Sequence, residues 1–248
     1  MKPFWQPDQL LFIMEVHAHT HTPRKKWTHY LWEFLMLFLA VFCGFLAENQ
    51  REHMIENQRE KQYIHSIIQD LKTDTANISE MLIKFEVIKK GCDSILNSFQ
   101  DFIRSFKETL FWKVAYGYPD FIYTDRTMQQ LKNAGGLRLI RNMNSADSIV
   151  NYDAIVKDIF IEQDGINRYW VRINEFADKF MRYRTLYKKG IEESRDIWLT
   201  KDENEFDHLY NLLIKYSITI VNYIRQLRNV ENSAGRLIVQ LQKEYQLK

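Results

Sequence analysis

The feature that most constrains the fold is the apolar stretch from Leu31 to Ala47, LWEFLMLFLAVFCGFLA. Its 17 residues include one charged group, Glu33, and no proline. With the four preceding residues it covers 27–47, long enough for a helix to cross a hydrocarbon layer of about 30 Å at about 1.5 Å per residue. Because unpaired backbone groups are costly in lipid, this stretch predicts a membrane-spanning helix.

Three other interpretations of the stretch compete with a spanning helix. A cleaved signal peptide would use the basic residues at 24–26, but Phe45 is too large for a cleavage site before Glu48. Lipid attachment at Cys43 would need a small residue where Phe42 stands. A buried core helix is the third interpretation, although cores rarely supply so long an unbroken apolar run. The spanning helix is favoured over all three.

The composition of the remaining chain favours long helices and excludes several functional classes. Pro119 is the single proline in the 201 residues after Ala47. The 34 basic and 32 acidic residues are mixed along the chain, so no block of one sign predicts nucleic-acid binding. Cys43 lies inside the predicted span and Cys92 outside it, so no disulfide within the chain is expected.

The segment before the span, 1–26, is predicted to be a tail without a fold of its own. Residues 1–13 show no pattern of a structural element, and Met14 is a possible true start. Alternating imidazoles in the tail are weak candidates for binding zinc, nickel or copper. They are His17, His19 and His21. No cysteine or fourth ligand completes the set, so a polar tail is favoured and no cofactor is expected.

The orientation of the predicted span rests on its flanking charges. Three basic residues at 24–26 abut its start. Beyond the span, basic residues at Arg51, Arg59 and Lys61 are spread out and have acidic neighbours. The positive-inside rule therefore favours a cytoplasmic N-terminus in the inner membrane of a Gram-negative cell, with the large domain in the periplasm.

The chain beyond the span predicts an all-α fold. Residues 48–62 are almost wholly polar yet helical in composition, which predicts a helical stalk. A lone polar helix is marginally stable, so a partner helix from another copy is implied. From Tyr63 apolar residues recur at steps of three and four, the period of an amphipathic helix. Further segments of this kind end near Gln246, so 63–248 predicts a bundle of four to six helices.

Local signals predict where these helices begin and end. Gly91 is expected to kink or end the first of them. Gly135 or Gly136 is expected to adopt positive φ and so to end a short helix before it. Ser145 or Asp147 is expected to cap the next helix, which is expected to run to about residue 187.

Two parts of the sequence resemble a known family. The first is WEFLMLFLAVFCGFLAENQREH (32–53) with EKQYIHSIIQDLKTDT (60–75), and the second is TMQQLKNAGGLRLIRN (127–142) with IVNYD (149–153). Together they resemble an uncharacterised family of bacterial single-pass membrane proteins, over about residues 14–165. The resemblance implies a short tail, one membrane helix and a helical extramembrane domain. It implies no activity, and no site residue is carried over from it.

Two features of the span carry functional expectations. Glu33 lies about one turn inside the apolar stretch, where a carboxylate is costly and marks a candidate ion path, proton site or contact between helices. The alternative is that Glu33 lies at headgroup depth and has no role. Ala40, Gly44 and Ala47 are small residues at spacings of four and three, which let helix backbones approach closely in lipid. A homo-oligomer joined along this face is expected.

One helical segment beyond the span combines aromatic and basic residues. The aromatic residues are Tyr169, Trp170, Tyr183 and Tyr187, and the basic residues are Arg168, Arg172, Arg182 and Arg184. Stacking and charge could bind an anionic ligand there. The favoured interpretation is a row of core aromatic residues with a solvated arginine edge.

The sequence contains no HExxH, GxSxG or CxxC motif, so no enzyme is expected. The favoured function is a membrane-anchored helical interaction or scaffold protein, oligomeric or part of an envelope complex, with lipid and other membrane proteins as partners. The alternatives are a channel or transport accessory subunit that uses Glu33, and a ligand-sensing helical domain.

Overall fold

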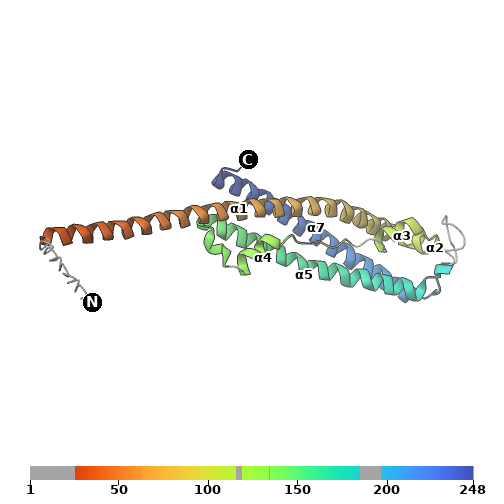
Figure 1. Cartoon of the computed structure of the whole chain (residues 1–248). Helices are drawn as coiled ribbons and strands as arrows, with labels where there is room; N and C mark the ends of the chain where they lie inside the picture. The colour runs from red at the N-terminus through yellow and green to blue at the C-terminus, as the bar shows by residue number, and fades with distance from the viewer. Residues whose placement is uncertain (1–25, 116–118, 134, 185–196, 248) are drawn as a thin grey trace, which may run out of the picture. The chain divides into compact units, whose positions relative to one another are not determined.

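The structure is a computed structural model that describes residues 26–115, 119–133, 135–184 and 197–247 (Figure 1). The expected all-α fold is confirmed over these residues. The helices are α1 (Trp27–Asn97), α2 (Phe99–Arg104), α3 (Glu108–Ala115), α4 (Arg126–Asn133), the 3-10 helix η1 (Gly136–Leu139), α5 (Met143–Phe180) and α7 (Glu203–Tyr245). The chain divides into two units, Met1–His53 and Met54–Lys248, and α1 contributes residues to both.

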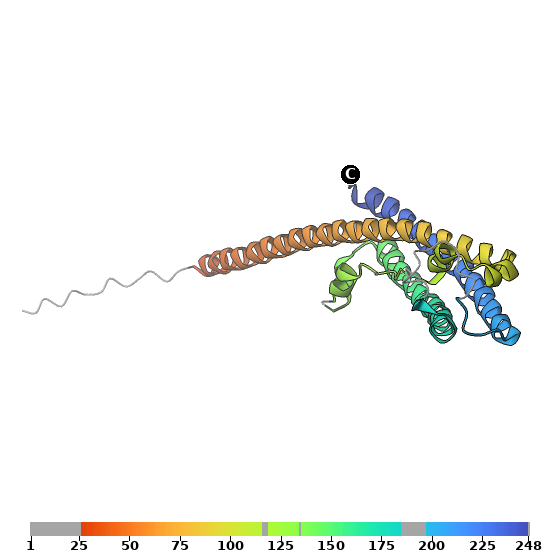
Figure 2. The same ribbon diagram turned by 90° about the vertical axis from the view of Figure 1, so that its right-hand side faces the viewer.

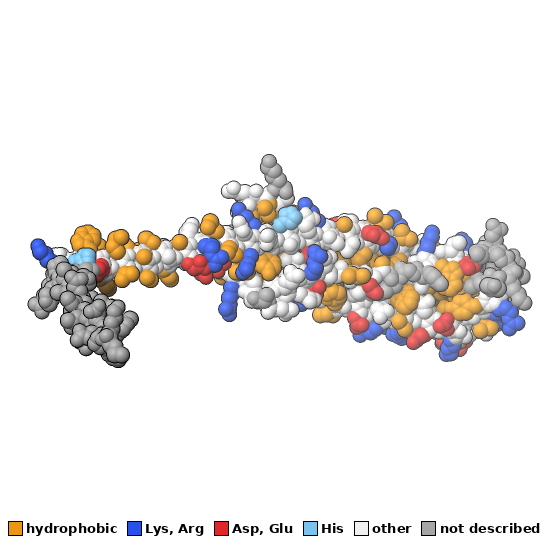
Figure 3. Space-filling model, in the orientation of Figure 1, with side chains coloured by type: hydrophobic (Ala, Val, Ile, Leu, Met, Phe, Trp, Pro, Cys, Tyr) orange, Lys and Arg blue, Asp and Glu red, His pale blue; other side chains and the backbone are white. Residues whose placement is uncertain are grey.

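The described part of the first unit is helical and apolar. In the part of the chain that the structure describes, one helix, α1, is long and apolar enough to cross a membrane. None of the residues in its most apolar window is buried, and apolar side chains line this part of α1 in Figure 3. A core helix of a soluble domain would bury such residues, because exposed apolar surface costs free energy in water.

The second unit is built on three long helices, α1, α5 and α7 (Figure 2). The helices α5 and α7 are antiparallel, because Lys179 near the end of α5 pairs with Glu205 near the start of α7. The helices α1 and α7 are also antiparallel, as the bond between Glu60 and Tyr245 and the contact between the Phe85 and Tyr223 rings, 5.0 Å apart, indicate.

The core of this unit follows the apolar period predicted from Tyr63 onward. Its fully buried side chains include Ile64, Leu71, Ile78, Phe85, Ile149, Tyr216 and Tyr223. Burying a side chain of this size contributes about 1.5–3 kcal/mol. These residues come from α1, α5 and α7, so the three helices share one core.

Two of the predicted helix boundaries need correction. Asn142 caps α5 by accepting a hydrogen bond from the Ser145 backbone N–H at 3.2 Å, so the cap lies before the predicted Ser145 or Asp147. Helix α5 ends at Phe180, where the Leu199 N–H donates to the Phe180 carbonyl oxygen at 2.8 Å. The predicted end near residue 187 lies outside the described residues.

The glycine predictions have different outcomes. Gly135 has φ of 64° and follows α4, as predicted for one of the two glycines. Helix α1 does not end at Gly91. A Cβ at Gly91 would lie 3.0 Å from Val114 Cγ2, so glycine at this position lets α3 pack closely against α1.

The predicted stalk, 48–62, is shorter in the structure, because its later residues belong to the bundle. The Glu60 side chain is only 6% exposed. Its Oε1 accepts hydrogen bonds from the Arg141 backbone N–H at 2.8 Å and from the Tyr245 hydroxyl at 2.6 Å. Glu56 also pairs with Arg141, at 2.8 Å. The helical domain therefore begins before the predicted boundary at Tyr63.

Candidate functional site

The only charged residue of the apolar stretch, Glu33, has a neighbour on its own helix. His29 Nε2 lies 3.1 Å from Glu33 Oε1, one turn away, and both side chains are about half exposed. Spacings of three, four and seven residues put Glu33 on the same side of α1 as Ala40, Gly44 and Ala47. We call these four residues the small-residue face.

The other side of this helix is aromatic. The rings of Phe34 and Phe38 stack with centroids 6.3 Å apart, and those of Phe38 and Phe42 stack at 5.9 Å. A Cβ placed on Gly44 would meet no atom within 4 Å, so the small-residue face is uncovered in the described chain. The apolar part of α1 therefore has two unlike faces, one small and polar and one aromatic.

The predicted metal-binding histidines, His17, His19 and His21, lie outside the described residues. Within the described residues no group of three or more His, Cys, Asp or Glu side chains is placed to hold a metal ion.

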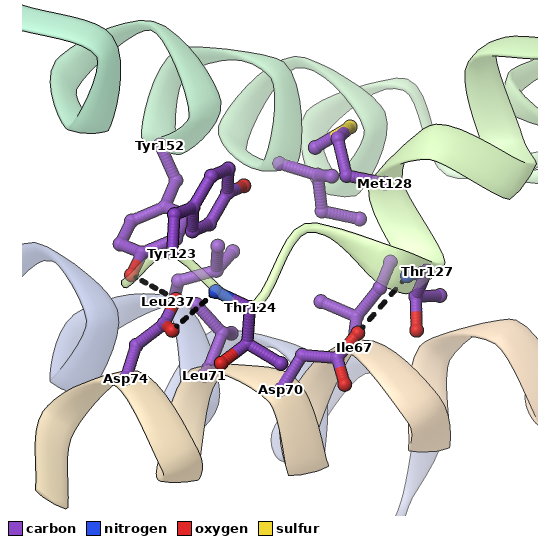
Figure 4. A pocket seen from close by; sticks show the side chains of 11 residues that line it. Ile67, Asp70, Leu71, Asp74, Tyr123, Thr124, Thr127, Met128, Tyr152 and Leu237 are labelled. Atoms are coloured by element: carbon purple, nitrogen blue, oxygen red, sulfur yellow. Dashed lines mark hydrogen bonds between the residues drawn. The ribbon is translucent and has the colours of Figure 1, made fainter. Parts of the chain in front are cut away.

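A buried polar network joins α1, α5 and the chain before α4 (Figure 4). Asp74, on α1, is only 1% exposed. Its carboxylate accepts hydrogen bonds from the Thr124 N–H and from the Tyr152 hydroxyl, both at 2.9 Å. One turn earlier, Asp70 accepts from the Thr127 N–H at 3.1 Å. Asp70 and Asp74 of α1 thus bind the backbone at the start of α4 and just before it.

Charged partners surround this network. Arg126 Nη2 lies 3.2 Å from Asp70 Oδ1. On α5, Asp153 lies 2.5 Å from Lys132 Nζ and 2.8 Å from Lys157 Nζ. The ion pairs between Arg126 and Asp70 and between Lys132 and Asp153 both join residues of α4 to a neighbouring long helix.

Asp74 and Asp153, which are both buried, differ in their electrostatics. Burial raises the pKa of the Asp74 carboxyl above its ordinary value, although hydrogen bonds from Thr124 and Tyr152 oppose the shift. Burial would also raise the pKa of Asp153, but hydrogen bonds and charges from Lys132 and Lys157 outweigh it and lower that pKa. Asp153 is therefore stabilised as an anion, whereas Asp74 is not.

The network leaves only a small cavity. Its volume is about 20 Å³, counted as the space open to the centre of a water molecule, and its lining includes Asp70, Asp74, Tyr123 and Tyr152. A cavity of this size holds about one water molecule. Burial raises the pKa of both tyrosines, so their hydroxyls stay protonated and donate hydrogen bonds. The network supports the fold and offers no room for a substrate.

A wider depression lies between the end of α1 and the start of α7. By the same measure its volume is about 430 Å³. It is lined by Leu96, Asn97, Ser98, Phe99, Gln100, Asp101, Asp207 and Tyr210. Binding sites for small molecules are usually enclosed and mostly apolar, whereas this depression is open and mostly polar.

The aromatic and basic segment, in α5 and the residues just after it, contributes to packing. Trp170 Nε1 donates to the Ala115 carbonyl oxygen at 2.8 Å, and Tyr169 packs against the core. The Tyr183 ring stacks on Trp112, with centroids 6.2 Å apart. The structure therefore agrees with core aromatic residues rather than a ligand site, while residue 187 lies outside the described part.

Sequence reasoning missed Asp70, Asp74 and Glu60. The signal for the first two was present, because Asp70 and Asp74 fall on the same helical side as Leu71 and Ile78. An acidic residue within an apolar face implies a buried partner.

Comparisons of the sequence with known protein families, with curated proteins and with solved structures found no match. The resemblance to bacterial single-pass membrane proteins therefore stays a prediction.

Proposed function

We propose that this chain is a membrane-anchored helical interaction protein of the bacterial inner membrane. Residues 27–47 of α1 would cross the bilayer, with the N-terminal tail in the cytoplasm and the helical domain in the periplasm. The observation that carries the proposal is the long apolar part of α1, none of which the described chain buries. The flanking charges support the orientation.

The small-residue face supports self-association as the form of the interaction. Ala40, Gly44 and Ala47 would let two copies of α1 approach closely in lipid, where packing drives association. Glu33 lies on the same face, and its carboxylate would cost less against a partner helix than against lipid. The aromatic face would then contact lipid. The structure contains one copy of the chain, so the partner is part of the proposal.

A second candidate function is a transport accessory role. The observation that favours it is the contact between His29 and Glu33 at 3.1 Å. Two titratable groups one turn apart inside a membrane could exchange a proton. In that case copies of α1 would line a path rather than pack tightly.

Oxidative crosslinking through Cys43 tests the self-association. Cys43 is exposed and adjacent to Gly44, so membranes treated with a mild oxidant should contain a crosslinked dimer. Gly44→Ile should reduce the dimer severalfold, because the added side chain separates the backbones. Phe38→Ile, on the aromatic face, is the matched control and should leave the dimer unchanged.

The proposed self-association would be wrong if the chain had a monomeric mass in mild detergent and Gly44→Ile did not change it. The same conclusion would require that no crosslinked dimer forms through Cys43 or through a cysteine placed at position 40 by Ala40→Cys.

A further inference from the structure

Two titratable residues, His29 and Glu33, lie on one side of α1 near its start. His29 Nε2 is 3.1 Å from Glu33 Oε1, and a spacing of four residues aligns the two side chains on the helix. His29 and Ala40 are 11 positions apart, which is about three helical turns. His29 therefore extends the small-residue face by one turn toward the start of α1.

The described chain places few other charges around this pair. Every described residue from 26 to 54 is exposed, so no described element packs against this part of α1. The other described basic residue near the start of α1 is Lys26, seven positions before Glu33. A lysine at the end of a span extends its ammonium group into the headgroups and water. His29 is therefore a titratable partner within reach of Glu33, and histidine ordinarily changes its charge between about pH 5 and 8.

Two-fold symmetry would bring the same residues of two copies together. In a pair of parallel identical helices, each residue of the shared face lies beside the same residue of the other copy. A pair joined along the small-residue face would therefore have two Glu33 carboxylates and two His29 imidazoles at one end of the contact. These four titratable groups would share a space from which the helices exclude water.

The charges of these four groups decide whether the contact is favourable. With both imidazoles neutral, two carboxylates face each other where the dielectric constant is low, and like charges there repel strongly. With both imidazoles protonated, the two histidines and two glutamates form neutral ion pairs. A proton shared between the two carboxylates would also relieve their repulsion. Either arrangement requires the pair of copies to hold protons that separate copies can release.

We propose that His29 and Glu33 make the self-association of this chain proton-dependent, because two associated copies bind more protons than two separate copies. The state that binds more protons is favoured in acid, so association strengthens as the pH falls and weakens as it rises. Each additional bound proton changes the association constant by up to about tenfold per pH unit. The inference rests on the proposed self-association and names its regulation.

Energy transfer between labelled copies of the full chain in vesicles measures this association. Asn57→Cys puts a reactive thiol at an exposed position of α1, in a chain that also carries Cys43→Ala. Cys92 can remain, because it is fully buried and burial raises the pKa of its thiol to about 12. Donor-labelled and acceptor-labelled chains are mixed in vesicles of phosphatidylcholine, with the same buffer on both sides of the bilayer.

The association constant should rise at least about tenfold between about pH 8 and about pH 6. Glu33→Gln removes the repelling charges and should associate equally at both pH values. His29→Gln removes the group that takes up the proton and should lower association at the acidic pH to about the wild-type level at the alkaline pH.

His53→Gln is the matched control, because His53 is also exposed on α1 but lies outside the apolar stretch. It should keep the pH dependence of the wild type. A change in lipid or label with pH would affect all four chains equally, whereas the proposed effect is confined to the two that retain both His29 and Glu33.

The proposal is overturned if the wild type associates with the same constant at both pH values, or if Glu33→Gln keeps the pH dependence. Either result would leave the self-association itself intact. An absence of energy transfer at every pH would instead contradict the proposed self-association, and the proton dependence with it.

Discussion

A chain with Leu39→Arg and Phe42→Arg is expected to be released from membranes by alkaline washing, whereas the wild type is expected to stay in the membrane pellet. Both residues are exposed and lie in the middle of the apolar stretch. Placing two arginines there costs about 5–7 kcal/mol on insertion scales, enough to prevent stable spanning. The measurement is the fraction of the chain recovered in the supernatant.

The matched control adds the same two charges elsewhere on the same helix. Ile83 and Val87 are 68% and 44% exposed, on the part of α1 that belongs to the helical domain. Ile83→Arg with Val87→Arg should leave the chain in the pellet. If the variant with arginines at 39 and 42 also resisted washing, the apolar stretch would not be the anchor.

Asp74→Ala is expected to lower the free energy of unfolding by about 2–5 kcal/mol. The substitution leaves the Thr124 N–H and the Tyr152 hydroxyl without the acceptor they use, and each such loss costs about 1–3 kcal/mol. Asp74→Asn keeps an oxygen for Thr124 and offers an N–H to Tyr152, so it should stay within about 1 kcal/mol of the wild type. Denaturant unfolding of the full chain in detergent measures both.

The pH dependence of the free energy of unfolding, compared between Asp74→Asn and the wild type, is a second test of the role of Asp74. Its pKa is raised in the folded state from 3.8, so the stability it contributes is full below that value and is lost as the pH rises through the folded pKa. Over this window Asp74→Asn should gain stability relative to the wild type. A constant difference between the two at all pH values would contradict the assigned burial of this carboxylate.

Asp153 should behave in the opposite way. Its pKa is lowered by Lys132 and Lys157 against the effect of burial. The stability it contributes is therefore present above 3.8 and is lost as the pH falls through the folded pKa. The two aspartates thus act on opposite sides of pH 3.8, Asp153 below it and Asp74 above it.

Local sequence signals predicted the elements whose stability is itself local. The apolar period predicted helices up to about Gln246, and α7 ends at Tyr245. Positive φ was predicted at Gly135 or Gly136, because left-handed backbone is costly for a residue with a Cβ, and Gly135 adopts it. These features depend on neighbours within a few residues.

The features that the sequence did not reveal depend on distant partners. Glu60 lies in a polar run that looks solvated, but its partners are Arg141 and Tyr245, which are 81 and 185 residues away. Gly91 was expected to kink or end a helix, whereas in the structure it leaves room for Val114 of α3. Hydrophobic periodicity places a residue on a face but does not say what will cover it.

The candidate functional residues likewise include some that the sequence predicted and some that only the fold brings together. Glu33 stands out in the sequence as the only charge in an apolar stretch, and its contact with His29 follows from their spacing of four. The hydrogen bonds from the Thr124 N–H to Asp74 and from the Thr127 N–H to Asp70 join residues 50 and 57 positions apart, so only the fold brings them together.

The most direct measurement of the central claim, that α1 crosses a bilayer, is the labelling of single cysteines with a reagent that does not cross membranes. Thr22→Cys, in the tail before the span, and Lys201→Cys would be placed separately in a chain whose Cys43 and Cys92 are replaced by alanine. In spheroplasts Lys201→Cys should label at once, and Thr22→Cys only after lysis. The reverse pattern would keep the span and invert its orientation. Labelling of both positions from the same side would contradict the account.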